Sequence, residues 1–151
     1  MRRVKNSVNL ARSENMRSIR SFGNRTTELR LKAILVQGGI SGWKLHDEDI
    51  LGIPDFFFQK ERLAVFVDGC FWHGCPKCGH IPKTNRAYWK AKIARNVHRD
   101  ALISRRLRAL GVRVLRLREC DLRARPTECL RRIRRALSRH KKAAVATLNL
   151  L

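Results

Sequence analysis

Apolar and polar positions alternate along the chain with two different periods, which indicates both helices and strands. Runs with apolar residues three or four positions apart predict helices, and short runs rich in Val, Phe and Leu predict strands. The expected helices span residues 26–37, 87–110 and a last stretch opening at 126, and the expected strands span residues 43–45, 55–58, 63–68 and 112–117. This order predicts a mixed α/β domain.

The two ends of the chain differ in composition from this central part. Residues 1–25 are polar and cationic, and we expect an arm that becomes ordered against a partner, with a short helix at 15–20. Residues 26–140 are expected to form the folded domain, and residues 141–151 a frayed C-terminal tail. A chain of 151 residues is long enough to bury one core, so a single domain with basic ends is expected.

Net charge narrows the class of partner. The chain carries 34 Lys and Arg against 12 Asp and Glu, a formal charge of +22. Such a surplus indicates a polyphosphate ligand, because each neutralised phosphate releases condensed counterions. Charge alone does not exclude a protein whose positive charge only keeps it soluble in an RNA-rich environment. No apolar run is long enough for a signal peptide or a membrane span, so we expect a cytoplasmic, nucleoid-associated protein without a membrane partner.

Three of the five cysteines are crowded into the segment VDGCFWHGCPKC, residues 67–78. The spacing in CPKC lets two thiolates bind one ion, and a distant cysteine at the end of a strand completes four soft ligands for a structural Zn²⁺. His73 or His80 is an alternative for one position. Cys129 lies on the apolar stripe of the last helix and is expected in the core. The four expected zinc ligands are Cys70, Cys75, Cys78 and Cys120.

Acidic residues at the strand ends predict a second metal site. If residues 59–62 form a four-residue hairpin loop, the register places Asp55 opposite Phe66. Asp55 and Asp68 then share one face about 7 Å apart, close enough to hold a hydrated Mg²⁺ together. A loop of another length would turn Asp68 away, and the backbone carbonyl of Val67 could still supply an oxygen.

Polar residues within the apolar stripe of the long helix supply further candidates. Asn96 and Asp100 fall inside that stripe, where a polar side chain is costly unless it is paired. Asp100 is expected to pair either with a buried Arg or backbone donor, or with His73. His73 suits a general base near neutral pH.

Aromatic and basic side chains near the same loop are candidate DNA contacts. Phe71 and Trp72 stand between zinc ligands in a basic chain, a position that favours insertion into DNA over core packing. Lys83 and Arg86 are expected to contact phosphates, which adds affinity for any duplex.

Together these segments carry a resemblance to a known family. The sequence contains, in order, GIPDFFF, FVDGCFWHGCP, PKTNRAYW, ARNVHRD and GVRVLRLREC. This series resembles the very-short-patch mismatch repair endonucleases (Vsr-like), relatives of the PD-(D/E)xK restriction nucleases, over about residues 13–122. The resemblance implies a restriction-endonuclease-like mixed sheet flanked by helices, with a structural zinc site.

The resemblance also implies roles for individual residues. Asp55 matches the metal-binding aspartate, His73 the catalytic histidine and Asp100 the acid that supports this histidine. Glu28 matches an acid near the site, and the four cysteines match the structural zinc set, although the family has histidine at one position. Phe71, Trp72 and Trp89 match aromatics that wedge beside the mismatch, and Met16 matches the arm that embraces the duplex.

Two departures from the family pattern concern the same site. Val67 and Asp68 stand where a family member has threonine and histidine, so Val67 would contribute its carbonyl. Asp68 is then either a true metal ligand or a substitute for the lost histidine. Ile53 replaces an arginine that usually precedes the proline, which leaves the sequence context of the substrate open.

The implied activity is a Mg²⁺-dependent endonuclease that nicks duplex DNA 5′ to the thymine of a T:G mismatch, as left by deamination of 5-methylcytosine. The alternatives are a non-catalytic zinc module that binds DNA and a nuclease of the same fold with another DNA target. We expect a monomer that acts on mismatched duplex DNA, with a functional link to a DNA cytosine methyltransferase and to mismatch-repair proteins.

Overall fold

A computed structural model of the chain describes residues 25–148, with side chains described from Thr27 to Ser138. The N-terminal arm, with its expected short helix and Met16, lies outside the described residues. No helix in this part of the chain is long and apolar enough to cross a membrane. The helices are α2 (Arg25–Gln37), α3 (Arg86–Ala109), α4 (Glu119–Ala124) and α5 (Pro126–Leu148), and the strands are β1 (Trp43–Leu45), β2 (Phe56–Phe58), β3 (Leu63–Asp68) and β4 (Arg113–Arg118).

The four strands form one mixed sheet in the order β1-β2-β3-β4. The first two pairs are antiparallel and the last, β3 with β4, is parallel. Phe58 pairs with Leu63, which confirms the register expected from a four-residue hairpin loop. The parallel pair requires a crossover, and the segment 69–85 together with α3 supplies it.

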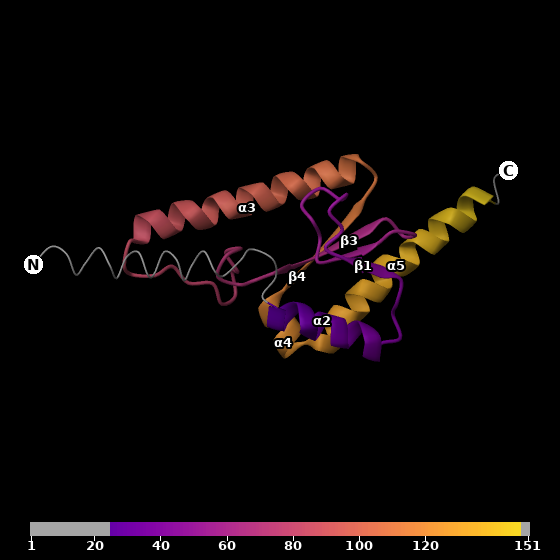
Figure 1. Cartoon of the computed structure of the whole chain (residues 1–151), viewed down its shortest axis with the longest axis horizontal. Coiled ribbons are helices and arrows are strands. Elements are labelled where there is room, and N and C mark those ends of the chain that lie inside the picture. The colour runs from indigo at the N-terminus through magenta and orange to yellow at the C-terminus, as the bar shows by residue number, and fades with distance from the viewer. Residues whose placement is uncertain (1–24, 149–151) are drawn as a thin grey trace, which may run out of the picture.

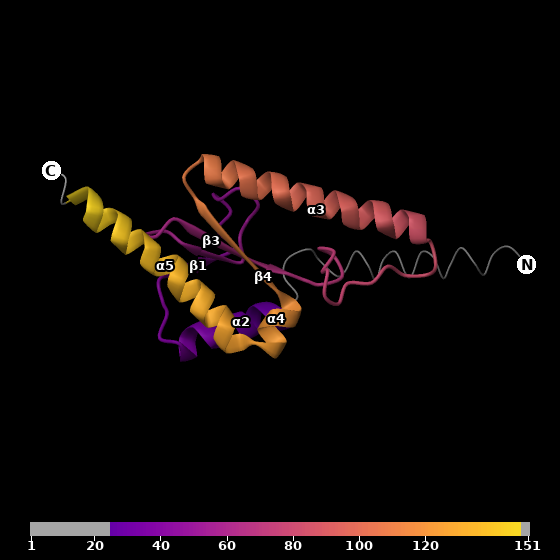
Figure 2. The ribbon, with the colours of Figure 1, turned by 180° about the vertical axis from the view of Figure 1, so that it is seen from behind.

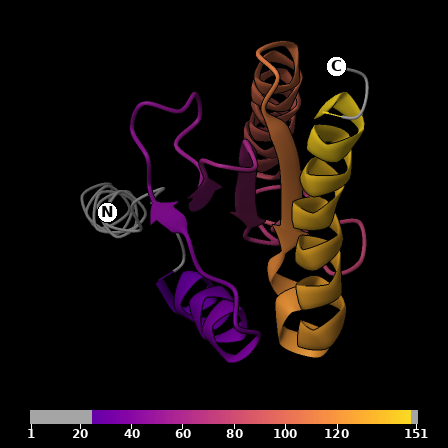
Figure 3. The ribbon, with the colours of Figure 1, turned by 90° about the vertical axis from the view of Figure 1, so that its right-hand side faces the viewer.

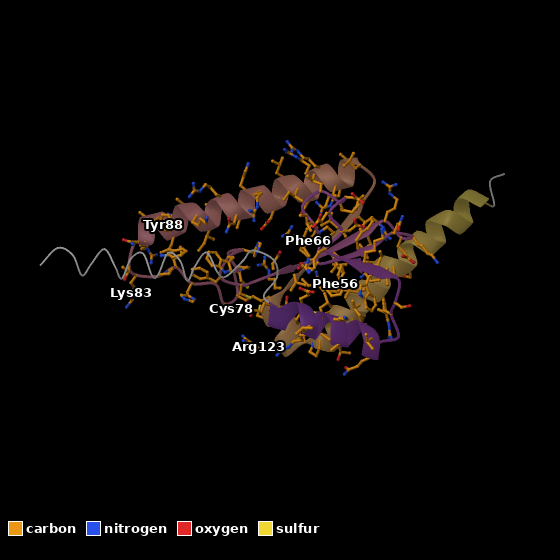
Figure 4. All side chains as sticks on the ribbon, viewed as in Figure 1. Phe56, Phe66, Cys78, Lys83, Tyr88 and Arg123 are labelled. Atoms are coloured by element: carbon orange, nitrogen blue, oxygen red, sulfur yellow. The ribbon has the colours of Figure 1, made fainter. Side chains whose placement is uncertain are left out.

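The sheet separates two apolar layers. Helix α3 lies along one face, whereas α2, α4 and α5 lie against the other, as Figures 1 and 2 show from opposite sides and Figure 3 shows from one end. Because strand side chains alternate, Phe56 and Phe66 point into different layers, as Figure 4 shows. The larger buried cluster comprises Leu31, Ile34, Leu35, Phe56, Phe58, Leu63, Val65, Leu117, Leu122, Cys129 and Ile133.

The apolar layer under α3 is smaller, and polar side chains continue the same face of the sheet beyond it. Its buried members are Phe57, Ala64, Phe66, Leu107 and Val112. Toward the carboxyl ends of β3 and β4, the same face carries Asp68, and Arg116 lies over the Phe66 ring, 4.7 Å from its centroid. The domain therefore places charged side chains between a helix and a sheet, where each needs a partner.

Two elements differ from the sequence expectations. Helix α4 has only six residues, too few for a visible hydrophobic period, and was not expected. Helix α5 continues to Leu148, through residues expected to be frayed, because the segment KKAAVATL lacks Gly and Pro and is rich in strong helix formers. Cys129 is fully buried in the core, as expected.

Removal of a buried side chain from α2 tests this packing. Leu31 is 0% exposed, and Leu31→Ala is expected to lower the free energy of unfolding by about 2 to 5 kcal/mol. Leu29, on the same helix, is 55% exposed, and Leu29→Ala should change it by less than about 0.5 kcal/mol. Urea unfolding of both variants measures the difference, and equal losses would contradict the packing of α2 on the sheet.

Candidate functional site

Four cysteine sulfurs form the first cluster, and they are the four predicted from the sequence. The Sγ atoms of Cys70, Cys75, Cys78 and Cys120 all lie within 4.8 Å of one another. The Sγ of Cys75 is 3.7 Å from that of Cys120 and 3.7 Å from that of Cys78. A tetrahedral Zn²⁺ with bonds of about 2.3 Å holds its sulfur ligands about 3.8 Å apart. The cluster therefore fits zinc in both ligand type and spacing.

The sheet topology brings these cysteines together. Asp68 and Arg118 are the last pair of the β3–β4 ladder, and Cys70 and Cys120 each follow that pair by two residues. The two parallel strands thus deliver both sulfurs to one edge of the sheet, where the Cys120 N–H donates to the Cys70 sulfur at 3.4 Å. Gly74 has a φ of +56°, and a Cβ there would meet Ile93 at 3.2 Å, so the loop packs tightly on α3.

The cysteine cluster has unequal thiols. Burial raises the pKa of Cys70 above its ordinary value. Burial also opposes ionisation of Cys75, but the backbone N–H groups of Lys77 and Cys78 lower its pKa to about 6. A cluster with one thiolate already favoured at neutral pH is ready to bind a cation, and the other ligands lose their protons as the metal binds.

His73, Asp100, Asp68 and Arg116 form a second cluster between β3, β4 and α3. Nδ1 of His73 is hydrogen-bonded to the Asp100 carboxylate and lies 3.8 Å from Asp68. Arg116 donates to both oxygens of Asp68, at 2.6 and 2.9 Å, and its guanidinium is 3.4 Å from Asp100. Asp100 therefore has both partners that the sequence left as alternatives, a histidine and a partly buried arginine.

Charge balance within this cluster favours the ionised form of Asp100. Burial would raise the pKa of Asp100, but the hydrogen bond with His73 and the charge of Arg116 hold it below its ordinary value. Because Asp100 engages Nδ1, Nε2 of His73 is the nitrogen left to exchange a proton with a substrate. A base oriented by a carboxylate is a recurrent arrangement in hydrolases.

A third cluster comprises Glu28 of α2, His46 after β1 and Asp55 before β2. One ligand atom from each lies within 4.8 Å of the others, and Glu28 Oε2 is 3.1 Å from His46 Nε2. The Val67 N–H donates to Asp55 Oδ2 at 2.7 Å, which fixes the carboxylate beside β3. Burial raises the pKa of Asp55, and the negative charges of Glu28 and Asp68 add to the effect.

The structure brings the predicted site residues into two neighbouring groups. Asp55 lies with Glu28 and His46, whereas Asp68 is held by Arg116 beside His73. The β2–β3 ladder begins at Phe56, so strand alternation does not fix the direction of the Asp55 side chain. Magnesium binding by Asp68 stays a prediction, and Arg116 competes with any metal for its oxygens.

Sequence reasoning missed Arg116 and His46. The available signal for Arg116 was its position in RVLRLR, on the same face of the sheet as Asp68, where a charged residue needs a partner. His46 follows a three-residue strand directly and has no sequence pattern that marks it.

Aromatic rings pack together where the cysteine-rich loop meets α3. The rings of Phe71, Trp72 and Trp89 lie 5.0 to 6.0 Å apart, centroid to centroid, in edge-to-face contacts, and Tyr88 extends the group. The Asn96 side chain donates to the Trp72 carbonyl at 3.1 Å, which explains this polar residue on the helix. All three predicted wedge residues are half-buried, so their insertion into DNA stays a prediction.

Exposed basic residues lie next to these rings. Figure 4 shows Lys83 and Tyr88 at the end of α3 that projects beyond the sheet, on the side of the molecule where Cys78 lies. Lys83 and Arg86 are both exposed, as expected for phosphate contacts. The aromatic group and the basic residues thus form one continuous region around the start of α3.

Comparisons with known proteins agree with this arrangement. A family model described as DNA mismatch endonuclease Vsr matches residues 8–79. The chain is 39% identical over 116 residues to the DNA mismatch endonuclease Vsr of Escherichia coli, covering 76% of this chain and 72% of that protein. It is 38% identical to the type II nicking enzyme V.NaeI of Lentzea aerocolonigenes, over 74% of this chain and 69% of that protein. It is 37% identical to the type II nicking enzyme V.NmeDIP of Neisseria meningitidis, over 83% of this chain and 85% of that protein.

The sulfur cluster predicts the metal content of the purified protein. We expect about one equivalent of zinc, and Cys120→Ala should reduce this content severely and lower the melting temperature, because three ligands bind zinc more weakly than four. Cys129→Ala is the matched control, since Cys129 is buried in the core and belongs to none of the three clusters. Elemental analysis and thermal melts measure both effects. Stoichiometric zinc in Cys120→Ala would contradict the four-sulfur site.

Proposed function

Since the chain belongs to the Vsr family of DNA mismatch endonucleases, we propose that it nicks one strand of duplex DNA at a T:G mismatch. The chain is a DNA endonuclease, a hydrolase of phosphodiester bonds. The proposal adds the T:G pair, cleavage 5′ to the thymine and a requirement for Mg²⁺. One observation carries it: a histidine oriented by a carboxylate and the partly buried Asp55 lie in neighbouring clusters beside β3, and aromatic rings pack where the loop after β3 meets α3.

Asp55 and the carbonyl of Val67 are the groups that would hold Mg²⁺. The N–H of Val67 points toward Asp55, and in a strand the carbonyl of the same residue faces the same neighbour. Continuing the β2–β3 register places Val67 opposite Pro54, which has no N–H to donate to that carbonyl. Two oxygens with water and substrate phosphate are typical of a protein Mg²⁺ site. When bound, Mg²⁺ would offset the negative charge that develops on the attacked phosphate.

His73 would act as general base in the same reaction. Its Nε2 would accept the proton of the attacking water, while Asp100 at Nδ1 stabilises the imidazolium that forms. Asp68 and Arg116 position this pair, because the guanidinium holds both carboxylates of the cluster. We propose these two as positioning residues and Glu28 as an acid at the metal side of the site.

The aromatic group would distinguish mismatched from matched DNA. A T:G wobble pair stacks less well than a matched pair, so opening the neighbouring base step costs less free energy there. Phe71, Trp72 and Trp89 would fill the opened step. The sulfur cluster would keep the loop of Phe71 and Trp72 rigid, and Trp89 is held on α3, which limits the entropy lost on binding. Deamination of 5-methylcytosine creates T:G pairs, so a DNA cytosine methyltransferase is the class of enzyme that supplies the substrate.

A second candidate is a nicking enzyme of this family with another DNA target. The type II nicking enzymes among the relatives favour it, since their names specify nicking without specifying a mismatch. A panel of duplexes with T:G, other mismatches and matched pairs in several sequence contexts separates the two candidates. Nicking of matched DNA at the same rate as T:G would exclude the mismatch assignment.

Asp55→Asn is expected to abolish nicking while leaving DNA binding intact. The same variant should melt a few degrees higher at pH 7 without added divalent metal. A carboxyl whose pKa is raised by folding contributes stability at low pH and loses it as pH rises through the folded pKa, whereas asparagine stays neutral. Nicking assays, binding isotherms and thermal melts check these outcomes.

The control for that prediction is Asp49→Asn, which removes an exposed carboxylate outside all three clusters. It should nick at the wild-type rate and melt at the wild-type temperature. Undiminished nicking by Asp55→Asn would remove Asp55 from the mechanism.

Trp72→Ala tests recognition by wedging. The variant should lose about 1 to 3 kcal/mol of binding to a T:G duplex, the range of base–aromatic stacking, and much less to a matched duplex. Lys83→Ala or Arg86→Ala should instead weaken both duplexes together and flatten the salt dependence. Isotherms at several salt concentrations distinguish the two patterns. If Trp72→Ala lost equal binding free energy on both duplexes, Trp72 would be a residue that stabilises the fold and not a wedge.

A further inference from the structure

His46 stands beside the proposed metal-binding carboxylate because of the sheet register. Leu45 and Phe56 are the last pair of the β1–β2 ladder, so His46 and Asp55 lie next to each other at its end. The His46 N–H reaches the Asp55 carbonyl at 3.5 Å. His46 has a φ of +46°, in the left-handed region that few residues other than glycine adopt. The backbone therefore turns sharply at the residue whose ring points to Glu28.

The side chains at this point have the spacing of metal ligands. Glu28 Oε2 and His46 Nε2 are 3.1 Å apart, and an Asp55 oxygen completes a set within 4.8 Å. Neighbouring ligands of an octahedral ion with bonds of about 2.1 Å lie about 3.0 Å apart. The three residues come from α2, the end of β1 and the start of β2, so three separate elements converge on one point.

The charge of this group also favours a cation. Two carboxylates with a neutral imidazole carry two negative charges, and the side chains of Glu28 and His46 are 18% and 30% exposed, which leaves them open to solvent. The Arg116 guanidinium is hydrogen-bonded to Asp68, in the neighbouring cluster.

We propose that His46 is a ligand of the active-site metal, together with Asp55 and Glu28, and that it makes the site prefer Mn²⁺ to Mg²⁺. Imidazole nitrogen binds transition-metal ions more strongly than it binds Mg²⁺, whose preferred ligands are oxygens. The inference rests on the proposed function for the presence of a divalent metal at Asp55. It adds Glu28 and His46 as side-chain ligands, and it states that the site, which also holds Mg²⁺, binds Mn²⁺ more tightly. The other arrangement of these groups is an ion pair between protonated His46 and Glu28.

The test measures metal binding by the zinc-loaded full chain without DNA. Calorimetry gives the affinities for Mn²⁺ and Mg²⁺, and pulsed electron paramagnetic resonance detects the ligands of bound Mn²⁺. The wild type is expected to bind Mn²⁺ about tenfold more tightly than Mg²⁺, with a nitrogen-14 coupling in the Mn²⁺ signal. In His46→Gln the coupling should disappear and the preference should fall to about twofold or less. Circular dichroism and zinc content establish that the variant is folded.

Matched histidine variants identify the nitrogen. His98, exposed on α3, and His73, in the neighbouring cluster, are the controls, and both His98→Gln and His73→Gln should keep the coupling and the preference. A wild-type Mn²⁺ signal without nitrogen coupling, a wild type that does not bind Mn²⁺, or a His46→Gln variant that keeps the preference would each overturn the assignment.

The failure of this inference is distinguishable from failure of the proposed function. If the wild type nicks T:G duplexes with Mg²⁺ and Asp55→Asn does not, the proposed function stands whatever the Mn²⁺ signal shows. If Asp55→Asn binds Mn²⁺ as tightly as the wild type does, metal binding at Asp55 fails and the role of His46 fails with it.

Discussion

Repulsion between carboxylates is the constraint on which the rest of this site depends. Glu28, Asp55, Asp68 and Asp100 gather around the carboxyl end of β3, partly removed from water. Arg116 offsets two of these charges and lies over an aromatic ring, so removing it would leave buried charge uncompensated. Burial raises the pKa of Asp55, and the negative charges of Glu28 and Asp68 add to the effect. The fold therefore places an arginine beside the two carboxylates that lie near His73, whereas Asp55 and Glu28 lie together with His46.

Rigidity is supplied next to this charge by sulfur and by helix packing. The loop that carries Phe71, Trp72 and His73 is held at both ends, by β3 and by the cysteine cluster, and the Trp72 carbonyl accepts a hydrogen bond from Asn96 of α3. One short segment thus fixes His73 relative to Phe71 and Trp72, which are proposed to meet the DNA. If both proposals hold, a displacement of these two rings would also move the proposed base.

Local patterns in the sequence were sufficient to predict the β2–β3 register and the cysteine cluster. The four-residue hairpin loop determined the β2–β3 register, and cysteine spacing identified all four sulfurs of the cluster. Pairing between distant side chains was harder to predict, because it depends on which faces the packed elements present. Asp55 precedes the ladder, so its direction was not determined by alternation, and Arg116 was not connected to Asp68 until β3 and β4 were aligned. Helix α4 is too short to have a period.

The parallel β3–β4 pair has a consequence for the order of folding. Its two strands are joined by a crossover of more than forty residues, and parallel ladders that close such long loops form slowly. Slippage by two residues would preserve the inward and outward faces yet displace Cys120 by about 6.6 Å from its partners. The four sulfurs would then lie too far apart to bind one ion. If the proposed zinc binds there, its site forms only in the correctly registered sheet, which would make zinc binding a late step of folding.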